Sequence, residues 1–178
     1  VAALIHELLR TQNVDLDYLV RYTNAHWLVV DEGKGADAGL FARDGKGHPL
    51  CFDKAAGTVG DAMLPEIAPA LVGSFKLPDG RAAKPSFQLL AERFLRAEYA
   101  PERAEAETGV PAATIRRIAA ELADAAFKQQ ITLPIAWTDT HGRRHETTTG
   151  RPVSMHAMRG ISAHSNGFQT CRLIHILQ

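Results

Sequence analysis

The sequence lacks the features that mark several classes of protein. Lys plus Arg and Asp plus Glu both number 20 among its 178 residues, so the formal net charge is zero. This balance excludes the strongly basic surface typical of proteins that bind nucleic acids or anionic lipids. No apolar run approaches the roughly 18 residues that a membrane-spanning helix needs. Membrane-spanning proteins and proteins that bind nucleic acids or anionic lipids are therefore poor interpretations of this chain.

Cysteine is also scarce. The only two, Cys51 and Cys171, lie far apart in the sequence. Two cysteines cannot form a four-cysteine zinc site, and they do not form the dense pattern of a secreted disulfide scaffold. We expect both to be reduced and to pack as small hydrophobic side chains.

The common phosphate-binding and nucleophile motifs are absent as well. The sequence contains no GxSxG, GxxxxGK[ST] or GxGxxG, which leaves no nucleophile elbow, P-loop or dinucleotide fingerprint. Of the eight histidines, His141 and His145 have the i, i+4 spacing that suits a metal on a helix. They flank Arg143 and Arg144 in a polar stretch predicted to be a loop, so we predict a solvated loop there and assign no metal ligands.

Periodicity and turn residues predict helices separated by short apolar strands. The predicted strands share apolar or β-branched residues, and a hairpin is predicted at 75–82. This alternation favours an α/β fold with a mainly parallel sheet flanked by helices, incomplete because few strands are visible. We expect residues 1–178 to be part of one such domain, with 44–85 as a long irregular excursion within it. The predicted helices are 1–10, 15–22, 86–99, 101–108, 111–126 and 166–178, and the predicted strands are 27–30, with 40–43 as a candidate partner, 131–137 and 153–157.

The end of the chain carries the most informative pattern. The predicted strand 153–157 leads into the turn 158–167, which contains two glycines and opens the last predicted helix. Backbone N–H groups at such a turn suit an anionic ligand, and the Arg159 guanidinium could grip a diphosphate. A plain strand-to-helix turn remains the alternative. The first helix lacks an N-cap and the last lacks an end signal, so we expect the chain to be part of a longer protein.

Three segments, in order, resemble the catalytic subunit of the molybdopterin oxidoreductases of the dimethyl-sulfoxide-reductase superfamily. The first is Asp15–Ala25 with the apolar residues that follow it, although His26-Trp27 stands where that family has a Pro-aromatic pair. The second is 87–114, which contains Tyr99-Ala100-Pro101-Glu102 and Glu107-Thr108-Gly109-Val110-Pro111-Ala112. The third runs from Gly160 through His164 and Asn166-Gly167 to Arg172. The resemblance covers nearly the whole chain.

The resemblance implies an internal fragment of a molybdenum-dependent oxidoreductase. It implies a dinucleotide-binding-like α/β domain that helps to hold bis-molybdopterin guanine dinucleotide with molybdenum, and a 4Fe–4S cluster outside this segment. Arg159, Gly160, Ile161 and His164 match positions that contact a guanine dinucleotide in that family, and no catalytic residue is carried over.

The resemblance also implies a substrate class and partners. The two divergent stretches, 44–85 and 138–151, are most similar to the branch that acts on sulfur oxyanions such as polysulfide, thiosulfate, tetrathionate and sulfite. The implied partners are an iron–sulfur electron-transfer subunit together with a membrane-anchor subunit, in the bacterial cytoplasm or periplasm. The alternative is a stand-alone nucleotide-binding α/β module without redox activity.

Overall fold

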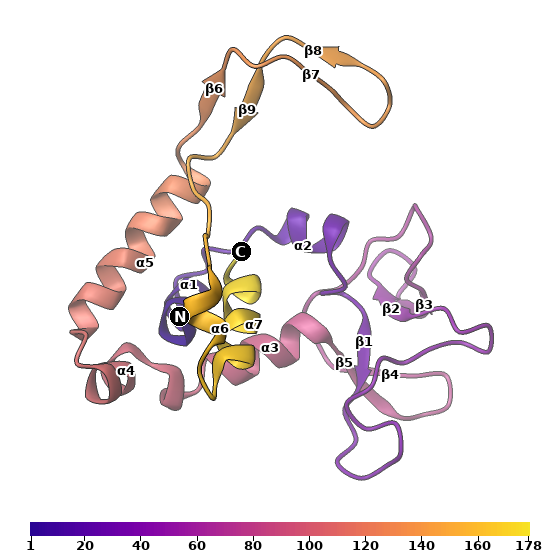
Figure 1. Ribbon diagram of the computed structural model, residues 1–178. Coiled ribbons are helices and arrows are strands. Elements are labelled where there is room, and N and C mark those ends of the chain that lie inside the picture. The colour runs from indigo at the N-terminus through magenta and orange to yellow at the C-terminus, as the bar shows by residue number, and fades with distance from the viewer. The chain divides into compact units, whose positions relative to one another are not determined.

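The computed structural model describes all residues from 1 to 178, and they form two compact units (Figure 1). Unit 1 contains Val1–Asn13 and Phe94–Gln178, and unit 2 contains Val14–Arg93. None of the helices is both long and apolar enough to span a membrane.

Helices dominate unit 1. Helix α1 (Ala2–Arg10) packs against α4 (Pro101–Thr108), α5 (Ala112–Phe127) and α7 (Gly167–Leu177). A single 3₁₀ turn, η1 (Ala97–Tyr99), precedes α4, and the four-residue α6 (Arg159–Ser162) packs on α7. The buried apolar residues of α1 and α5 are mostly small, which lets the two helices approach closely. They are Ala3, Ile5, Ala112, Ile115, Ala119 and Ala123.

The helix ends in unit 1 follow simple local rules. Pro101 occupies the first turn of α4, where its missing N–H costs nothing. Gly109 ends that helix with φ at 72°, a left-handed conformation that glycine adopts without strain. Both assignments confirm the sequence prediction for this helix.

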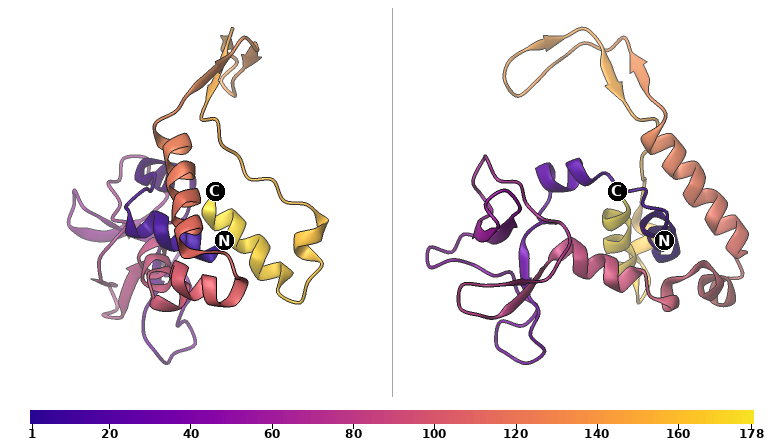
Figure 2. Two further views of the ribbon diagram at one scale, coloured as in Figure 1. Left: turned by 90° about the vertical axis from the view of Figure 1, so that its left-hand side faces the viewer. Right: turned by 180° about the vertical axis from the view of Figure 1, so that it is seen from behind.

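A two-stranded ribbon follows α5. Strand β6 (Ile131–Leu133) pairs antiparallel with β9 (Thr148–Gly150), and β7 (Trp137–Thr138) pairs antiparallel with β8 (Arg144–His145). Pro134 separates β6 from β7, as expected for a residue that cannot donate to a ladder. In Figures 1 and 2 the ribbon projects beyond the end of α5.

Unit 2 is built around short antiparallel strands. Helix α2 (Leu16–Tyr22) begins at Asp15, whose carboxylate accepts the N–H of Tyr18 at 3.0 Å. Strands β1 (Leu28–Val30), β5 (Ala82–Pro85) and β4 (Phe75–Lys76) form a sheet in the order β1-β5-β4. Strands β2 (Leu50–Asp53) and β3 (Thr58–Asp61) form a separate hairpin, and α3 (Ser86–Phe94) follows β5.

The core of unit 2 lies between the sheet and this hairpin. Phe52 stacks on Phe75 with ring centroids 4.0 Å apart, which joins the two. Cys51 is fully buried, and burial raises the pKa of its thiol to about 11, so it packs as an unreactive hydrophobic side chain. Both cysteines are free, as predicted. The core residues are Leu28, Val30, Ala42, Leu50, Leu77 and Ala83.

The predicted α/β fold with a mainly parallel sheet is wrong. Every strand pair in the chain is antiparallel, and the strands are two to four residues long. Parallel pairing needs a crossover connection, usually a helix, that returns the chain to the same edge. Here β1 is joined to β5 by the excursion that carries β2 to β4, and β6 is joined to β9 by the segment that carries β7 and β8. The other partners are joined by turns.

Candidate functional site

The four residues expected to contact a dinucleotide lie on the turn before α7. Arg159, Gly160 and Ile161 belong to α6, and His164 follows it. Ile161 is partly buried and the other three are exposed. The turn has a defined shape, since the Ile161 N–H donates to the Met158 carbonyl at 3.1 Å and the Gly167 N–H donates to the His164 carbonyl at 2.9 Å.

The surroundings of this turn differ from those expected. Residues 153–157, predicted to be a strand that leads into the turn, have no regular structure, so that prediction is wrong. A Cβ built on Gly160 would meet no atom within 4 Å, so the space beside this residue is open. A four-residue helix also has too few aligned peptides for a substantial dipole. Within this chain the four residues therefore do not enclose a dinucleotide, and their role in cofactor binding stays a prediction.

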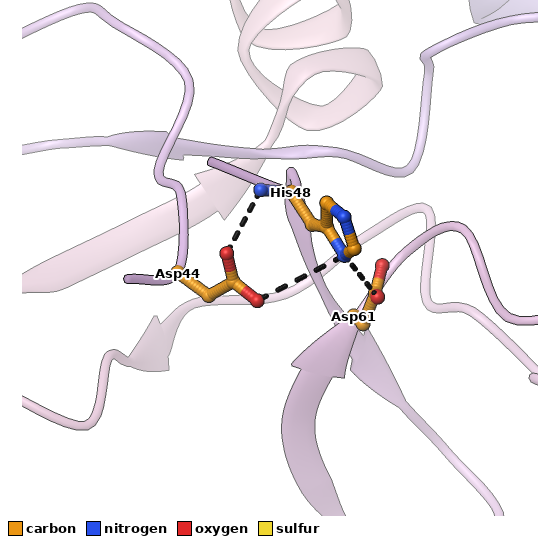
Figure 3. Close-up of side chains that lie close together, drawn as sticks. All are labelled: Asp44, His48 and Asp61. Carbon is orange, nitrogen blue, oxygen red and sulfur yellow. Dashed lines mark hydrogen bonds and ion pairs between the residues drawn. The ribbon is translucent and has the colours of Figure 1, made fainter. Parts of the chain in front are cut away.

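Figure 3 shows a second group of polar side chains, in unit 2, that the sequence did not single out. Asp44 begins the turn before β2, His48 lies just ahead of that strand, and Asp61 is the last residue of β3. The His48 Nδ1 lies 2.7 Å from Asp61 Oδ2 and 4.0 Å from Asp44 Oδ2. The β2–β3 hairpin brings Asp61 to His48, since Leu50 pairs with Asp61 in the ladder.

In each carboxylate of this Asp44–His48–Asp61 cluster, one oxygen accepts hydrogen bonds from the backbone and the other lies toward the imidazole. Asp44 Oδ1 accepts the backbone N–H groups of Lys46 and His48, both at 2.8 Å. Asp61 Oδ1 accepts the N–H of Met63 at 2.8 Å. In both residues this leaves Oδ2 directed at the ring (Figure 3).

The charges in the cluster stabilise one another. The hydrogen bond that His48 donates to the Asp61 carboxylate raises the pKa of His48, and the Asp44 carboxylate adds a smaller effect in the same direction. Backbone N–H donors and His48 lower the pKa of both carboxyl groups. The ring nitrogen and the two Oδ2 atoms lie within 4.8 Å of one another, a set that could also ligate a divalent cation. Because all three groups already have partners in the chain, the arrangement is most simply an imidazolium held between two carboxylates.

Replacing Asp61 with Asn is expected to return the pKa of His48 toward 6.5, the ordinary value for histidine, because it removes the charge that contacts the ring. Because the pKa of His48 is higher in the folded protein than in the unfolded chain, the ion pair stabilises the fold fully below pH 6.5. This stabilisation disappears as the pH rises through the pKa of the folded protein. A histidine NMR titration of both proteins measures the shift. Asp44→Asn, at 4.0 Å, is the control and should move the pKa less. Equal shifts from the two variants would contradict this description.

Three further histidines, His6, His26 and His145, have structural environments. His6 is buried, and its Nδ1 lies 2.8 Å from the Phe94 carbonyl oxygen. Burial lowers the pKa of His26, which keeps that ring neutral. His145 stacks on Trp137 and lies 3.1 Å from the Asp139 carboxylate at the tip of the ribbon. Residues 141–145 therefore belong to the end of a hairpin.

Comparisons with known proteins add one relative. No protein-family model matches the chain. The A subunit of the sulfite dehydrogenase of Allochromatium vinosum is 47% identical over 184 residues, an alignment that covers 98% of this chain. The alignment covers 19% of that relative, so the chain spans about a fifth of its length.

These findings correct the family assignment made from the sequence. No family model matches, and the relative is named as a subunit of sulfite dehydrogenase. Nothing in the comparisons assigns the chain to the molybdopterin oxidoreductases as a catalytic-subunit fragment, and that assignment is withdrawn. The relative's name agrees with the expected sulfur-oxyanion substrates, although it describes the relative and not an activity of these 178 residues.

Proposed function

We propose that this chain is a segment of a longer subunit of an oxidoreductase that acts on a sulfur oxyanion, with sulfite as the substrate. The observation that carries the proposal is the 47% identity to the sulfite dehydrogenase relative across 98% of the chain. Identity at this level over both compact units supports a common role for the segment.

The structure supports a scaffolding role for the segment within such an enzyme. The His48 cluster is internally paired, Cys51 is buried and unreactive, and the terminal turn is open. None of these groups pairs a nucleophile with a general base, and none of them lines a closed substrate pocket. In the proposed enzyme the reacting groups therefore come from the rest of the polypeptide.

The partners expected from the sequence belong to the same proposal. A protein named as one subunit of a sulfite dehydrogenase works with other subunits, and sulfite oxidation releases two electrons that need an acceptor. An iron–sulfur electron-transfer subunit together with a membrane-anchor subunit would serve that need. The expected cofactors stay untested predictions for the complete protein, and no residue of this chain is given a catalytic role toward them.

The stand-alone nucleotide-binding module has less support. It was expected to be an α/β domain, and the chain has no parallel sheet. The relative also extends far beyond the aligned segment.

Purification of the complete protein with its native partners tests the proposal. We expect sulfite to drive reduction of an electron acceptor, with little activity on thiosulfate, tetrathionate or polysulfide. A preparation that uses thiosulfate, tetrathionate or polysulfide in preference to sulfite would keep the sulfur-oxyanion class and overturn the choice of substrate. Activity on none of them would overturn the proposal.

A further inference from the structure

The ribbon that follows α5 carries an uncovered row of apolar side chains. From β6 to β7 every second residue is large and apolar: Ile131, Leu133, Ile135 and Trp137. Their exposed fractions are 43%, 41%, 54% and 46%. A strand that alternates in this way normally buries one face.

The ribbon covers only one end of this row, where Trp137 stacks on His145 with ring centroids 4.7 Å apart and its indole N–H donates to the Thr147 carbonyl. Across the β6–β9 ladder, Ile131 faces Gly150 and Leu133 faces Thr148, so neither has a large apolar partner. Thr132 and Thr149 pair on the opposite face, where their hydroxyl oxygens are 3.0 Å apart. The β6–β9 part of the ribbon therefore has one face with paired threonines and one face on which Ile131 and Leu133 have no large apolar residue opposite them.

Such a ribbon is not stable by itself. An isolated two-stranded hairpin is marginal in water and needs a further strand or a packed surface. Exposed apolar patches of this kind usually mark an interface. The unpaired edges of β6 and β9 would also favour aggregation if they stayed open.

We infer that the row Ile131, Leu133, Ile135 and Trp137 is an internal interface of this longer subunit, covered by an apolar surface from the part of the polypeptide outside these 178 residues. This inference rests on the proposed function. Because the alignment covers 98% of this chain and 19% of the relative, the relative is about five times as long, which leaves ample chain to supply the cover. The row bears no charge, so its occupant is an apolar surface.

Cysteine labelling of the complete protein tests the interface. Leu133→Cys places a thiol in the row, and Thr132→Cys places one at the adjacent position on the polar face. Maleimide labelling, followed by mass spectrometry of the peptide, distinguishes each thiol from the other cysteines. We expect the native protein to protect the cysteine at 133 at least roughly tenfold relative to the urea-unfolded protein, with weaker protection at 132.

Several results would overturn the inference. Equal reactivity of the cysteine at 133 in native and unfolded protein would mean that the row is open to solvent. Equal protection at 132 and 133 would mean that both faces of the ribbon are covered alike, so that the apolar face is not a specific interface. Protection that disappears on dilution would point to a second copy. Protection in the isolated 178-residue chain would mean that this chain covers its own row.

Two further measurements keep the test decisive. If the variants do not fold, hydroxyl-radical footprinting of Trp137 in the unmodified complete protein gives the same comparison. Sulfite turnover of the same preparation separates the two proposals: turnover with an open row overturns the interface alone, and a protected row without turnover overturns the proposed substrate alone.

Discussion

Replacing Arg10 with Met is expected to destabilise unit 1 by clearly more than the loss of an exposed ion pair, because it leaves a buried carboxylate without its main partner. The Glu7 side chain is only 3% exposed. Arg10 donates to both of its oxygens, with contacts of 2.8 to 3.2 Å. This hydrogen-bonded pair lowers the pKa of Glu7, whereas the Arg116 Nε is farther away, at 3.7 Å from Oε2. Met keeps most of the aliphatic volume, so the change isolates the lost charge.

Equilibrium urea unfolding measures the effect, and the chain offers a matched control. Arg117 pairs with Glu121 on α5 with the same ion types, but both side chains are exposed. Arg117→Met should cost less than about 0.5 kcal/mol. Equal losses in the two variants would mean that the burial of Glu7 does not decide the strength of its ion pair.

Replacing Gly167 with Ala is expected to disrupt the packing of α6 on α7, at a cost of about 2 kcal/mol. A Cβ at this position would lie 2.3 Å from the Ser162 carbonyl oxygen and 2.8 Å from its Cα. Both atoms belong to the backbone, so no side-chain rotation relieves the clash. Amide hydrogen exchange in residues 159–177 should accelerate.

Gly160 provides the control, because it also lies in a helix and has open space around it. Alanine has the higher helix propensity, so Gly160→Ala should leave exchange unchanged or slow it slightly. Faster exchange in Gly160→Ala than in Gly167→Ala would contradict the geometry of this turn. Within this chain, the glycine that a close backbone approach requires is therefore Gly167.

The helices could be predicted from the sequence because their signals are local. Asp15 caps α2, Pro101 and Gly109 bound α4, and the last helix begins next to its predicted start. The 75–82 hairpin is confirmed as β4 and β5, and the pairing of 27–30 with 40–43 is confirmed by the bridge between Val29 and Phe41. Each of these depends on a few neighbouring residues.

The sheet and the polar cluster could not be predicted, because both depend on pairing between distant residues. Short apolar strands separated by helices fit parallel and antiparallel sheets equally well, and here β1 pairs with β5, more than 50 residues later. Residues 153–157 have strand-like side chains but no pairing partner. The proximity of His48 to Asp61 depends on the register of the β2–β3 hairpin, which a stretch with little periodicity does not reveal.

Sulfite oxidation by the purified complete enzyme tests the central claim most directly. We expect sulfite and water to give sulfate and two protons, with two electrons reaching the acceptor for each sulfate formed. The isolated 178-residue chain should form no sulfate. A complete enzyme that leaves sulfite unchanged, with its partner subunits and an acceptor present, would contradict the assignment.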